Sequence, residues 1–297
     1  MNEIVLFNDK IKMGVLPEIG GAISFFKYKQ KDKMIDVMRP YEKSPKGDDA
    51  NNASMFVMMP FCSRIRGGSF VYWGITRKMA KNHPGIQDPI HGDGWKSKWE
   101  VVSQSDTKIE MKLIHDKDKG GFPFSYDGTI IYELKGDKLD ITLGVKNTNQ
   151  LPMPCGLGIH PFFTKTKEVE LDFTTTQVWS NETDPIFDKP YMTPETWQFD
   201  GGRPLKNAVF DTCFGGFNGK ASILYPDMGI SVAIEADESF GHVILYAPRG
   251  KGFFCLEPVT NATNAFNLAA NGSIGTGIKS IGPNQTMNAK ISLTIRG

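Results

Sequence analysis

Residues 129–145 read TIIYELKGDKLDITLGV and contain two short apolar segments, 129–134 and 139–145, separated by the four residues Lys-Gly-Asp-Lys. Both segments alternate polar with apolar positions and are rich in β-branched residues, the pattern of a β-strand with one buried face. Further segments of this kind recur along the chain, at 108–114, 221–224, 230–234, 242–246, 252–256 and 289–295. Strands therefore dominate the predicted secondary structure.

The fold class follows from how these segments are spaced. Gly, Pro, Asn and Asp punctuate them at short intervals, and the few helical possibilities are short, such as one around 194–197. Regularly spaced strands without intervening long helices favour an all-β sandwich or barrel over a βαβ fold. No shift in composition marks a linker, so we expect residues 1–297 to form a single domain.

Composition excludes several partners. The 34 basic and 33 acidic side chains leave a formal net charge of +1, so no overall field favours nucleic acid or an anionic membrane. The longest apolar runs, such as 55–62, are far shorter than the roughly 20 residues that cross a bilayer. The N-terminus lacks a basic run followed by an apolar block, so we expect a cytoplasmic protein. The near-zero net charge favours a neutral small-molecule partner.

The cysteines indicate neither a disulfide framework nor a metal site. Cys62, Cys155, Cys213 and Cys255 stand well apart, with no Cys-x-x-Cys pair and no histidine cluster at zinc-ligand spacing. We therefore expect free thiols in a reducing compartment and no bound metal.

The segment Gly156-Leu157-Gly158-Ile159-His160-Pro161-Phe162-Phe163 places one titratable ring among small and apolar residues. Proline fixes the backbone directly after the ring. Because the ordinary pKa of histidine lies at about 6.5, His160 is a candidate proton donor. The alternative is a core histidine whose nitrogens are bonded to backbone groups.

A candidate partner lies in Phe253-Phe254-Cys255-Leu256-Glu257-Pro258. Glu257 ends an apolar strand before a proline, so we expect it at the rim of the core, where partial burial raises a carboxyl pKa towards that of a general base. If His160 and Glu257 meet across a cleft, they supply an acid and a base on opposite sides of one small substrate. Because phosphate-loop, nucleophile-elbow and His-Glu-x-x-His motifs are absent, cofactor-free proton transfer remains.

Three further polar residues stand between apolar neighbours. Arg64 follows the apolar run 55–62, where its guanidinium could bind hydroxyl oxygens or form an ordinary ion pair. His91 lies in a glycine-rich turn and is either a ligand or an exposed imidazole. Asp211 lies between phenylalanines and is either a ligand or a loop cap.

Trp95 or Trp99 could form an apolar wall for a sugar ring, or simply belong to the core.

Taken in order, these segments resemble the aldose 1-epimerase, or galactose mutarotase-like, family. The matching residues span most of the chain and are Ser63-Arg64-Ile65 with Gly68 and Phe70, Ile90-His91-Gly92 with Gly94-Trp95, Gly158-Ile159-His160-Pro161-Phe162-Phe163, Phe210-Asp211, and Cys255-Leu256-Glu257-Pro258. The ordered combination is far more specific than any one segment.

The resemblance implies a large antiparallel β-supersandwich that binds a free sugar and interconverts its α and β anomers without metal or nucleotide. It implies that Glu257 is the general base and His160 the general acid. It also implies that Arg64, His91 and Asp211 hold the sugar.

One departure concerns substrate preference. The family's Asn-Arg pair is Ser63-Arg64 here, so a hydroxyl replaces an amide. Four basic residues lie near the sugar-binding segments, namely Arg66, Arg77, Lys78 and Lys96. If their side chains converge beside the site of the sugar ring, the substrate could be a charged sugar, such as a hexose 6-phosphate or a sulfosugar. A solvated basic surface is the ordinary interpretation of such residues.

A third alternative is a non-catalytic carbohydrate-binding protein that keeps the sandwich. The presence of both His160 and Glu257 argues against it, because a binding protein needs neither an acid nor a base at these positions.

Overall fold

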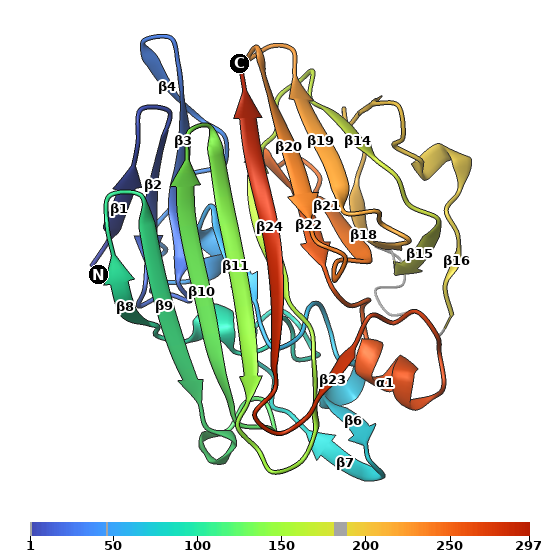
Figure 1. The fold of residues 1–297 in the computed structure, drawn as a ribbon. Coiled ribbons are helices and arrows are strands. Elements are labelled where there is room, and N and C mark those ends of the chain that lie inside the picture. The colour runs from blue at the N-terminus through green and yellow to red at the C-terminus, as the bar shows by residue number, and fades with distance from the viewer. Residues whose placement is uncertain (1, 46, 181–188) are drawn as a thin grey trace.

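The computed structural model describes residues 2–45, 47–180 and 189–297, and in these residues two large antiparallel sheets pack face to face (Figure 1). The larger sheet follows the order β1 (Ile4–Phe7), β2 (Ile11–Leu16), β3 (Ala22–Gln30), β5 (Met55–Met58), β13 (Gly158–Thr164), β22 (Phe253–Val259), β21 (His242–Ala247), β18 (Phe210–Gly215), β15 (Gln177–Ser180) and β16 (Tyr191–Met192), with β4 (Lys33–Asp36) paired to β3.

The second sheet follows the order β17 (Arg203–Pro204), β14 (Glu170–Phe173), β19 (Lys220–Tyr225), β20 (Ile230–Ala236), β24 (Thr286–Arg296), β11 (Lys138–Asn147), β10 (Tyr126–Lys135), β9 (Lys108–His115) and β8 (Glu100–Gln104). Two small two-stranded sheets lie outside the sandwich. One is the hairpin of β6 (Ser69–Tyr72) with β7 (Ile75–Lys78), and the other pairs β12 (Met153–Cys155) with β23 (Lys279–Ile281). The predicted all-β sandwich is confirmed.

Helices are few and short in the described residues. The α-helix is α1 (Ala265–Ala270), and the 3-10 turns are η1 (Ala50–Asn52), η2 (Arg66–Gly68), η3 (Gly94–Lys96), η4 (Lys117–Lys119) and η5 (Glu195–Trp197). The short helix expected around 194–197 is thus a 3-10 turn, whereas α1 was not predicted. None of these helices has the length and apolar character needed to span a bilayer.

The stretch 129–145 forms the hairpin between β10 and β11, in which Ile130 pairs with Leu143 and Lys135 with Lys138. Gly136 takes a φ of 61° at the first turn position, which a type II′ turn requires and a residue with a side chain disfavours. The buried face of this hairpin packs against the larger sheet, and its other face is partly exposed.

The middle of the larger sheet differs, because β5, β13 and β22 are buried on both faces. One face contributes to the core between the sheets, through Val57, Ile159 and Leu256. The opposite face forms a second apolar cluster with Phe56, Phe162 and Cys255. This second face carries the polar pocket described below.

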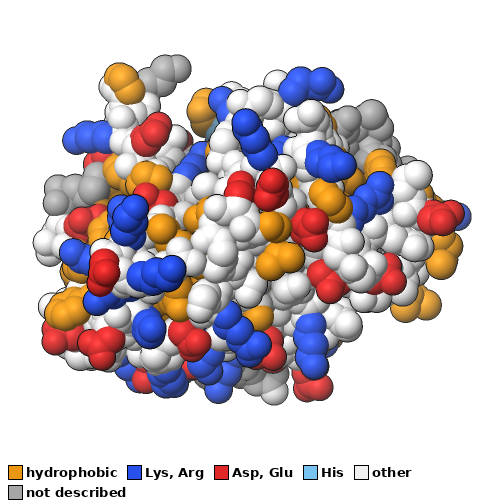
Figure 2. All heavy atoms as spheres, turned by 90° about the horizontal axis from the view of Figure 1, so that it is seen from above, with side chains coloured by type: hydrophobic (Ala, Val, Ile, Leu, Met, Phe, Trp, Pro, Cys, Tyr) orange, Lys and Arg blue, Asp and Glu red, His pale blue; other side chains and the backbone are white. Residues whose placement is uncertain are grey.

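Charged side chains of both signs are interspersed on the face of the molecule seen from above (Figure 2). This distribution agrees with the near-equal numbers of basic and acidic residues.

Candidate active site

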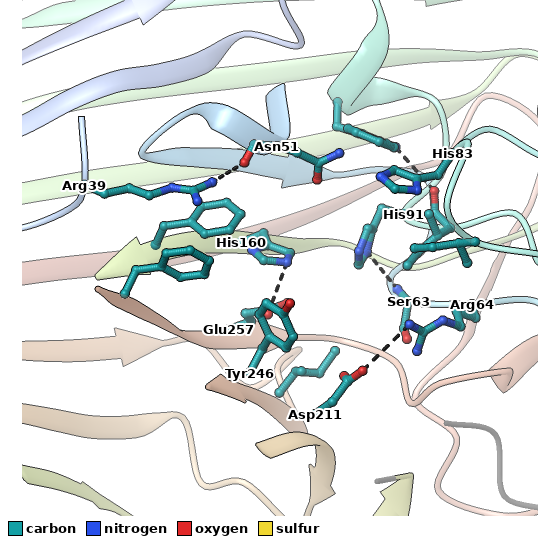
Figure 3. A pocket seen from close by; sticks show the side chains of 16 residues that line it. Arg39, Asn51, Ser63, Arg64, His83, His91, His160, Asp211, Tyr246 and Glu257 are labelled. Carbon is teal, nitrogen blue, oxygen red and sulfur yellow. Dashed lines mark hydrogen bonds and ion pairs between the residues drawn. The ribbon is translucent and has the colours of Figure 1, made fainter. Parts of the chain in front are cut away.

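His160 and Glu257 lie on neighbouring strands in a register that puts them opposite each other. Gly158 pairs with Val259 and Phe162 with Cys255. As a result, His160 Nε2 lies 3.4 Å from Glu257 Oε1 (Figure 3). The expectation of an acid and a base on opposite sides of a substrate is wrong, because strand pairing brings the two groups side by side.

Glu257 also does not end its strand, since β22 continues to Val259. Pro161 and Pro258 lack the amide hydrogen that a sheet ladder uses, and both lie in the interval where the pairs between β13 and β22 are interrupted. Glu257 is only 1% exposed, so it lies within the second apolar cluster rather than at the rim of the core.

Burial dominates the proton affinities of both groups. It raises the pKa of Glu257 well above its ordinary value, and the negative charge of Asp211 adds to this shift. It lowers the pKa of His160 to about 3, and the positive charge of Arg39 acts in the same direction. Glu257 Oε2 has no hydrogen-bond partner among the described residues. The pair therefore consists mainly of a neutral His160 imidazole and a protonated Glu257 carboxyl group. Moving one proton from Glu257 to His160 across the 3.4 Å contact converts it to imidazolium and carboxylate.

The raised pKa of Glu257 makes the stability of the fold depend on pH. Because the folded state holds the carboxyl proton to higher pH than the unfolded chain, the folded state loses stability as pH rises above the unfolded pKa of about 4.3. Glutamine cannot ionise. We expect Glu257→Gln to gain free energy of unfolding relative to the wild type as pH increases, measured by denaturant unfolding between about pH 5 and pH 9. A difference that stays constant over this range would contradict a raised pKa.

His91 lines the same pocket, edge-on to His160 with ring centroids 5.4 Å apart. The backbone N–H of Ser63 donates to His91 Nδ1 at 3.1 Å, so the ring hydrogen resides on Nε2. Burial lowers the pKa of His91 well below its ordinary value. His91 is therefore a neutral hydrogen-bond donor rather than the exposed imidazole of the alternative interpretation.

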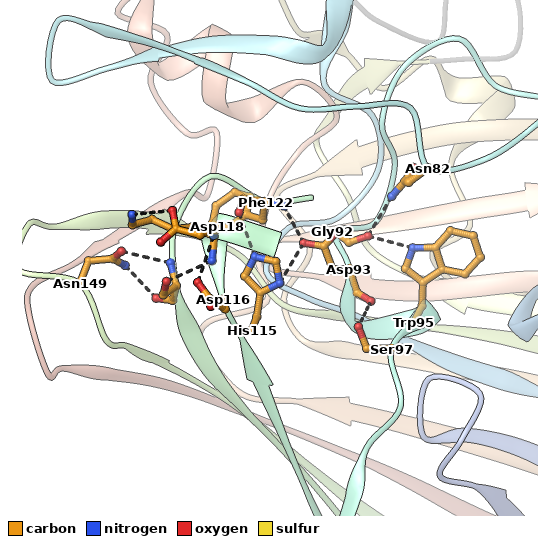
Figure 4. Close-up of polar contacts among 12 residues, drawn as sticks. Asn82, Gly92, Asp93, Trp95, Ser97, His115, Asp116, Asp118, Phe122 and Asn149 are labelled. Carbon is orange, nitrogen blue, oxygen red and sulfur yellow. Dashed lines mark hydrogen bonds and ion pairs between the residues drawn. The ribbon is translucent and has the colours of Figure 1, made fainter. Parts of the chain in front are cut away.

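The turn that carries His91 is held from two directions. On one side, the N–H groups of Asp93 and Gly94 donate to the carbonyl of Met59 at 2.9 and 3.0 Å. The carbonyl of Gly92 accepts from the indole of Trp95 at 3.0 Å (Figure 4). These bonds fix the backbone directly after His91.

On the other side, the carboxylate of Asp93 accepts the N–H of Phe122 at 2.8 Å and lies 3.7 Å from His115 Nδ1 (Figure 4). His115 Nε2 bonds to the carbonyl of Phe122 at 2.9 Å. Because that carbonyl can only accept, Nε2 carries a hydrogen. The contact ties the His91 turn to the end of β9 in the second sheet.

Gly92 is the most constrained position of this turn. Its φ is 69°, and a Cβ there would lie 2.0 Å from the carbonyl oxygen of Met59. We expect Gly92→Ala to lower the free energy of unfolding by about 2–3 kcal/mol more than Gly74→Ala, because Gly74 has a φ of 71° but open space around it. Denaturant unfolding of both variants measures the difference, and equal losses would contradict the proposed clash.

Arg64 and Asp211 form an ion pair in the pocket lining, with Arg64 Nη2 3.7 Å from Asp211 Oδ2. Arg64 is therefore both ion-paired and a pocket residue. Asp211 is not a loop cap, since it lies within β18 and pairs with Tyr246. Together they present guanidinium donors and carboxylate acceptors to the pocket.

All five predicted site residues line one pocket of about 420 Å³, within the size range of small-molecule sites. Trp95 contributes a wall, whereas Trp99 belongs to the core between the sheets. Other lining residues were not predicted, among them Arg39, Asn51, Tyr246 and Phe253. Tyr246 and Phe253 show the same pattern as ordinary strand residues, so no sequence signal marks them.

The basic residues singled out from the sequence do not converge on this pocket. Arg66, Arg77, Lys78 and Lys96 are absent from its lining, and Lys96 instead borders a neighbouring hollow. The arginines that line the pocket are Arg64 and Arg39.

His160, Cys255 and Glu257 are the group among the described residues that could hold a metal ion, with donor atoms within 4.8 Å of one another. A thiol ligates metals as the thiolate. Burial raises the pKa of Cys255 well above its ordinary value. A metal ion would have to displace the proton of this buried thiol to bind here.

Two large antiparallel sheets with this pocket on the outer face of the larger one define a galactose mutarotase-like protein. The model of the aldose 1-epimerase family matches residues 3–294, and the chain belongs to this family.

Individual proteins and solved structures are similar to this chain over most of its length. The uncharacterized protein YphB of Escherichia coli K12 is 26% identical over 267 residues, covering 87% of this chain and 88% of YphB. The crystal structure of a candidate aldose 1-epimerase from E. coli K12 is 24% identical, covers 99% of both chains and has a TM-score of 0.88. A galactose mutarotase-like protein from Clostridium acetobutylicum is 21% identical, covers 99% of this chain and 95% of its own, and has a TM-score of 0.84.

Proposed function

We propose that the protein is an aldose 1-epimerase, which interconverts the α and β anomers of an aldose by opening and closing its ring. The observation that carries this proposal is the 3.4 Å contact between His160 Nε2 and Glu257 Oε1 at the pocket wall. The anomeric hydroxyl oxygen and the ring oxygen of a cyclic aldose are both bonded to C1. An acid and a base that serve both oxygens must therefore be neighbours.

In the proposed mechanism, the Glu257 carboxylate takes the proton of the anomeric hydroxyl while the His160 imidazolium donates a proton to the ring oxygen. The bond between C1 and the ring oxygen breaks, and C1 becomes an aldehyde. Rotation about the C1–C2 bond exposes the other carbonyl face. Reversal of both proton transfers closes the ring as the other anomer, so the enzyme regains its starting protonation state.

Arg64, His91 and Asp211 would hold the remaining hydroxyl groups. Arg64 and His91 Nε2 supply donors, and the carboxylate of Asp211 supplies acceptors. Such contacts keep the open-chain aldehyde oriented for ring closure, which limits its escape.

Exchange between anomers, measured by NMR or polarimetry with glucose and galactose, their 6-phosphates and a 6-sulfonate, tests the proposal. We expect at least one aldose to exchange faster than it does without protein. If the protein binds these sugars but accelerates none of them, the non-catalytic carbohydrate-binding alternative replaces the proposed function.

A further inference from the structure

Arg39 is a pocket residue that forms no ion pair with a carboxylate among the described residues. The exposed Glu42 acts on its charge only from outside the pocket lining. Arg39 is half-buried, between β4 and β5. Its Nε donates to the carbonyl of Ala53 at 3.2 Å, and its Nη2 donates to the carbonyl of Asn51. Its Cζ lies 3.6 Å from the ring centroid of Phe162 and 4.3 Å from that of Phe253. These contacts orient the guanidinium and leave several of its N–H groups available.

The charges of the pocket do not balance. Arg64 is paired with Asp211, and the His160–Glu257 pair is neutral overall in both arrangements of its shared proton. Among the lining residues the charge of Arg39 remains, so the pocket lining carries about one positive charge in excess. A neutral sugar would leave this charge uncompensated, whereas a monoanionic one would neutralise it.

Asn51 adds a second donor beside Arg39. It lines the same pocket, and its side-chain nitrogen is buried without a hydrogen-bond partner among the described residues. A buried amide without a partner is costly unless a ligand satisfies it. The fork of the Arg39 guanidinium matches the oxygens of a carboxylate or a sulfonate. The Asn51 amide would have to turn over for its buried N–H₂ to face the same ligand.

The position of Arg39 relative to the acid indicates which part of a sugar would carry the charge. The ring of Phe162 stacks on His160 at 4.5 Å between centroids, and the guanidinium of Arg39 lies over the same ring. Figure 3 shows Arg39 and Arg64 at opposite ends of the pocket, with His160 and Glu257 between them. In an aldohexopyranose, the ring oxygen is bonded to C5, which carries the exocyclic C6. A group on C6 therefore extends from the ring oxygen, which His160 would protonate.

We propose that the substrate is an aldose with one negative charge on C6, a carboxylate or a sulfonate, and that Arg39 and Asn51 bind this group. The inference rests on the proposed function, because His160 orients the sugar. It differs from the charged-sugar alternative drawn from the sequence, whose basic residues lie outside the pocket.

The test compares each acidic sugar with its neutral parent. Values of kcat/KM for anomer exchange are measured by NMR for glucuronate, galacturonate and 6-deoxy-6-sulfoglucose, and for glucose and galactose. Hydrogen bonds to a charged group are worth about 10- to 100-fold, so we expect the wild type to prefer the acidic sugar by about this factor. Comparing the two uronates with the sulfonate identifies which oxyanion fits.

Arg39→Met should remove this preference, and Arg39→Lys, which keeps the charge but loses the fork, should retain part of it. The matched control is Lys96→Met, which removes a positive charge 4.7 Å from the ring of Trp95 but outside the pocket lining. We expect the preference to persist in that variant. Equal or better turnover of neutral sugars by the wild type would overturn the proposal, as would equal loss of preference in Lys96→Met.

A separate measurement distinguishes this inference from the proposed function. If no aldose is turned over, the proposed function fails, and calorimetric titration of the same sugars then tests Arg39 alone. Binding of the acidic sugar that weakens about 10- to 100-fold in Arg39→Met would support the anion site. No measurable preference for the acidic sugar in binding would overturn it. Thermal unfolding of each variant shows whether the fold is kept.

Discussion

Replacing Glu257 with glutamine is expected to lower kcat/KM for anomer exchange by about 10²- to 10⁴-fold, the contribution of one positioned proton-transfer group. Glutamine has nearly the shape of glutamate, so it fits the same buried position, which is 1% exposed. It cannot accept the proton of the anomeric hydroxyl. Polarimetry or NMR exchange with the aldose that the wild type turns over best measures the loss.

The matched control is Glu235→Gln, the same chemical change at an exposed position of β20 in the second sheet. We expect this variant to keep the wild-type rate. If Glu257→Gln also kept that rate, Glu257 would no longer be a candidate for the base. A similar loss in both variants would show that the change is not specific to the pocket.

The strands predicted in the second sheet were recognisable because each has one buried face and one partly exposed face. The segments 129–134 and 139–145 alternate polar and apolar residues and lie within β10 and β11, each of which has a buried and a partly exposed face. The strand β13 shows no alternation, because both of its faces are buried. The helix α1 has six residues, too few for a helical period to be recognised.

The site was predictable only in part. Motif resemblance identified His160 and Glu257, but their distance depends on the pairing of β13 with β22, which no spacing in the sequence reveals. The burial of Glu257 was underestimated, because Pro258 suggested a strand end and the second apolar cluster was not foreseen. Arg39 lies in a polar connection without a local motif. Its place in the pocket depends on how β4 and β5 are arranged, which no sequence pattern shows.

His160→Asn is expected to reduce kcat/KM for anomer exchange by about 10²- to 10⁴-fold, because asparagine cannot donate a proton to the ring oxygen. The imidazole stacks between Phe56 and Phe162, each at 4.5 Å between centroids, so its loss also removes packing. Thermal unfolding of His160→Asn and of a second variant, His160→Gln, separates lost stability from lost chemistry. A normal rate in both folded variants would reassign the acid, with His91 the next candidate.

The double variant His160→Asn/Glu257→Gln tests whether the two groups act in one step. If Glu257 removes a proton while His160 supplies one, either single change already disables the concerted reaction. The double variant should then be little less active than the less active of the two single variants, because groups that act as a unit have strongly non-additive effects. The two losses in ΔΔG‡ would instead add if the groups contributed independently. Their 3.4 Å contact favours the concerted reaction, because it places both groups within reach of the two oxygens on one anomeric carbon.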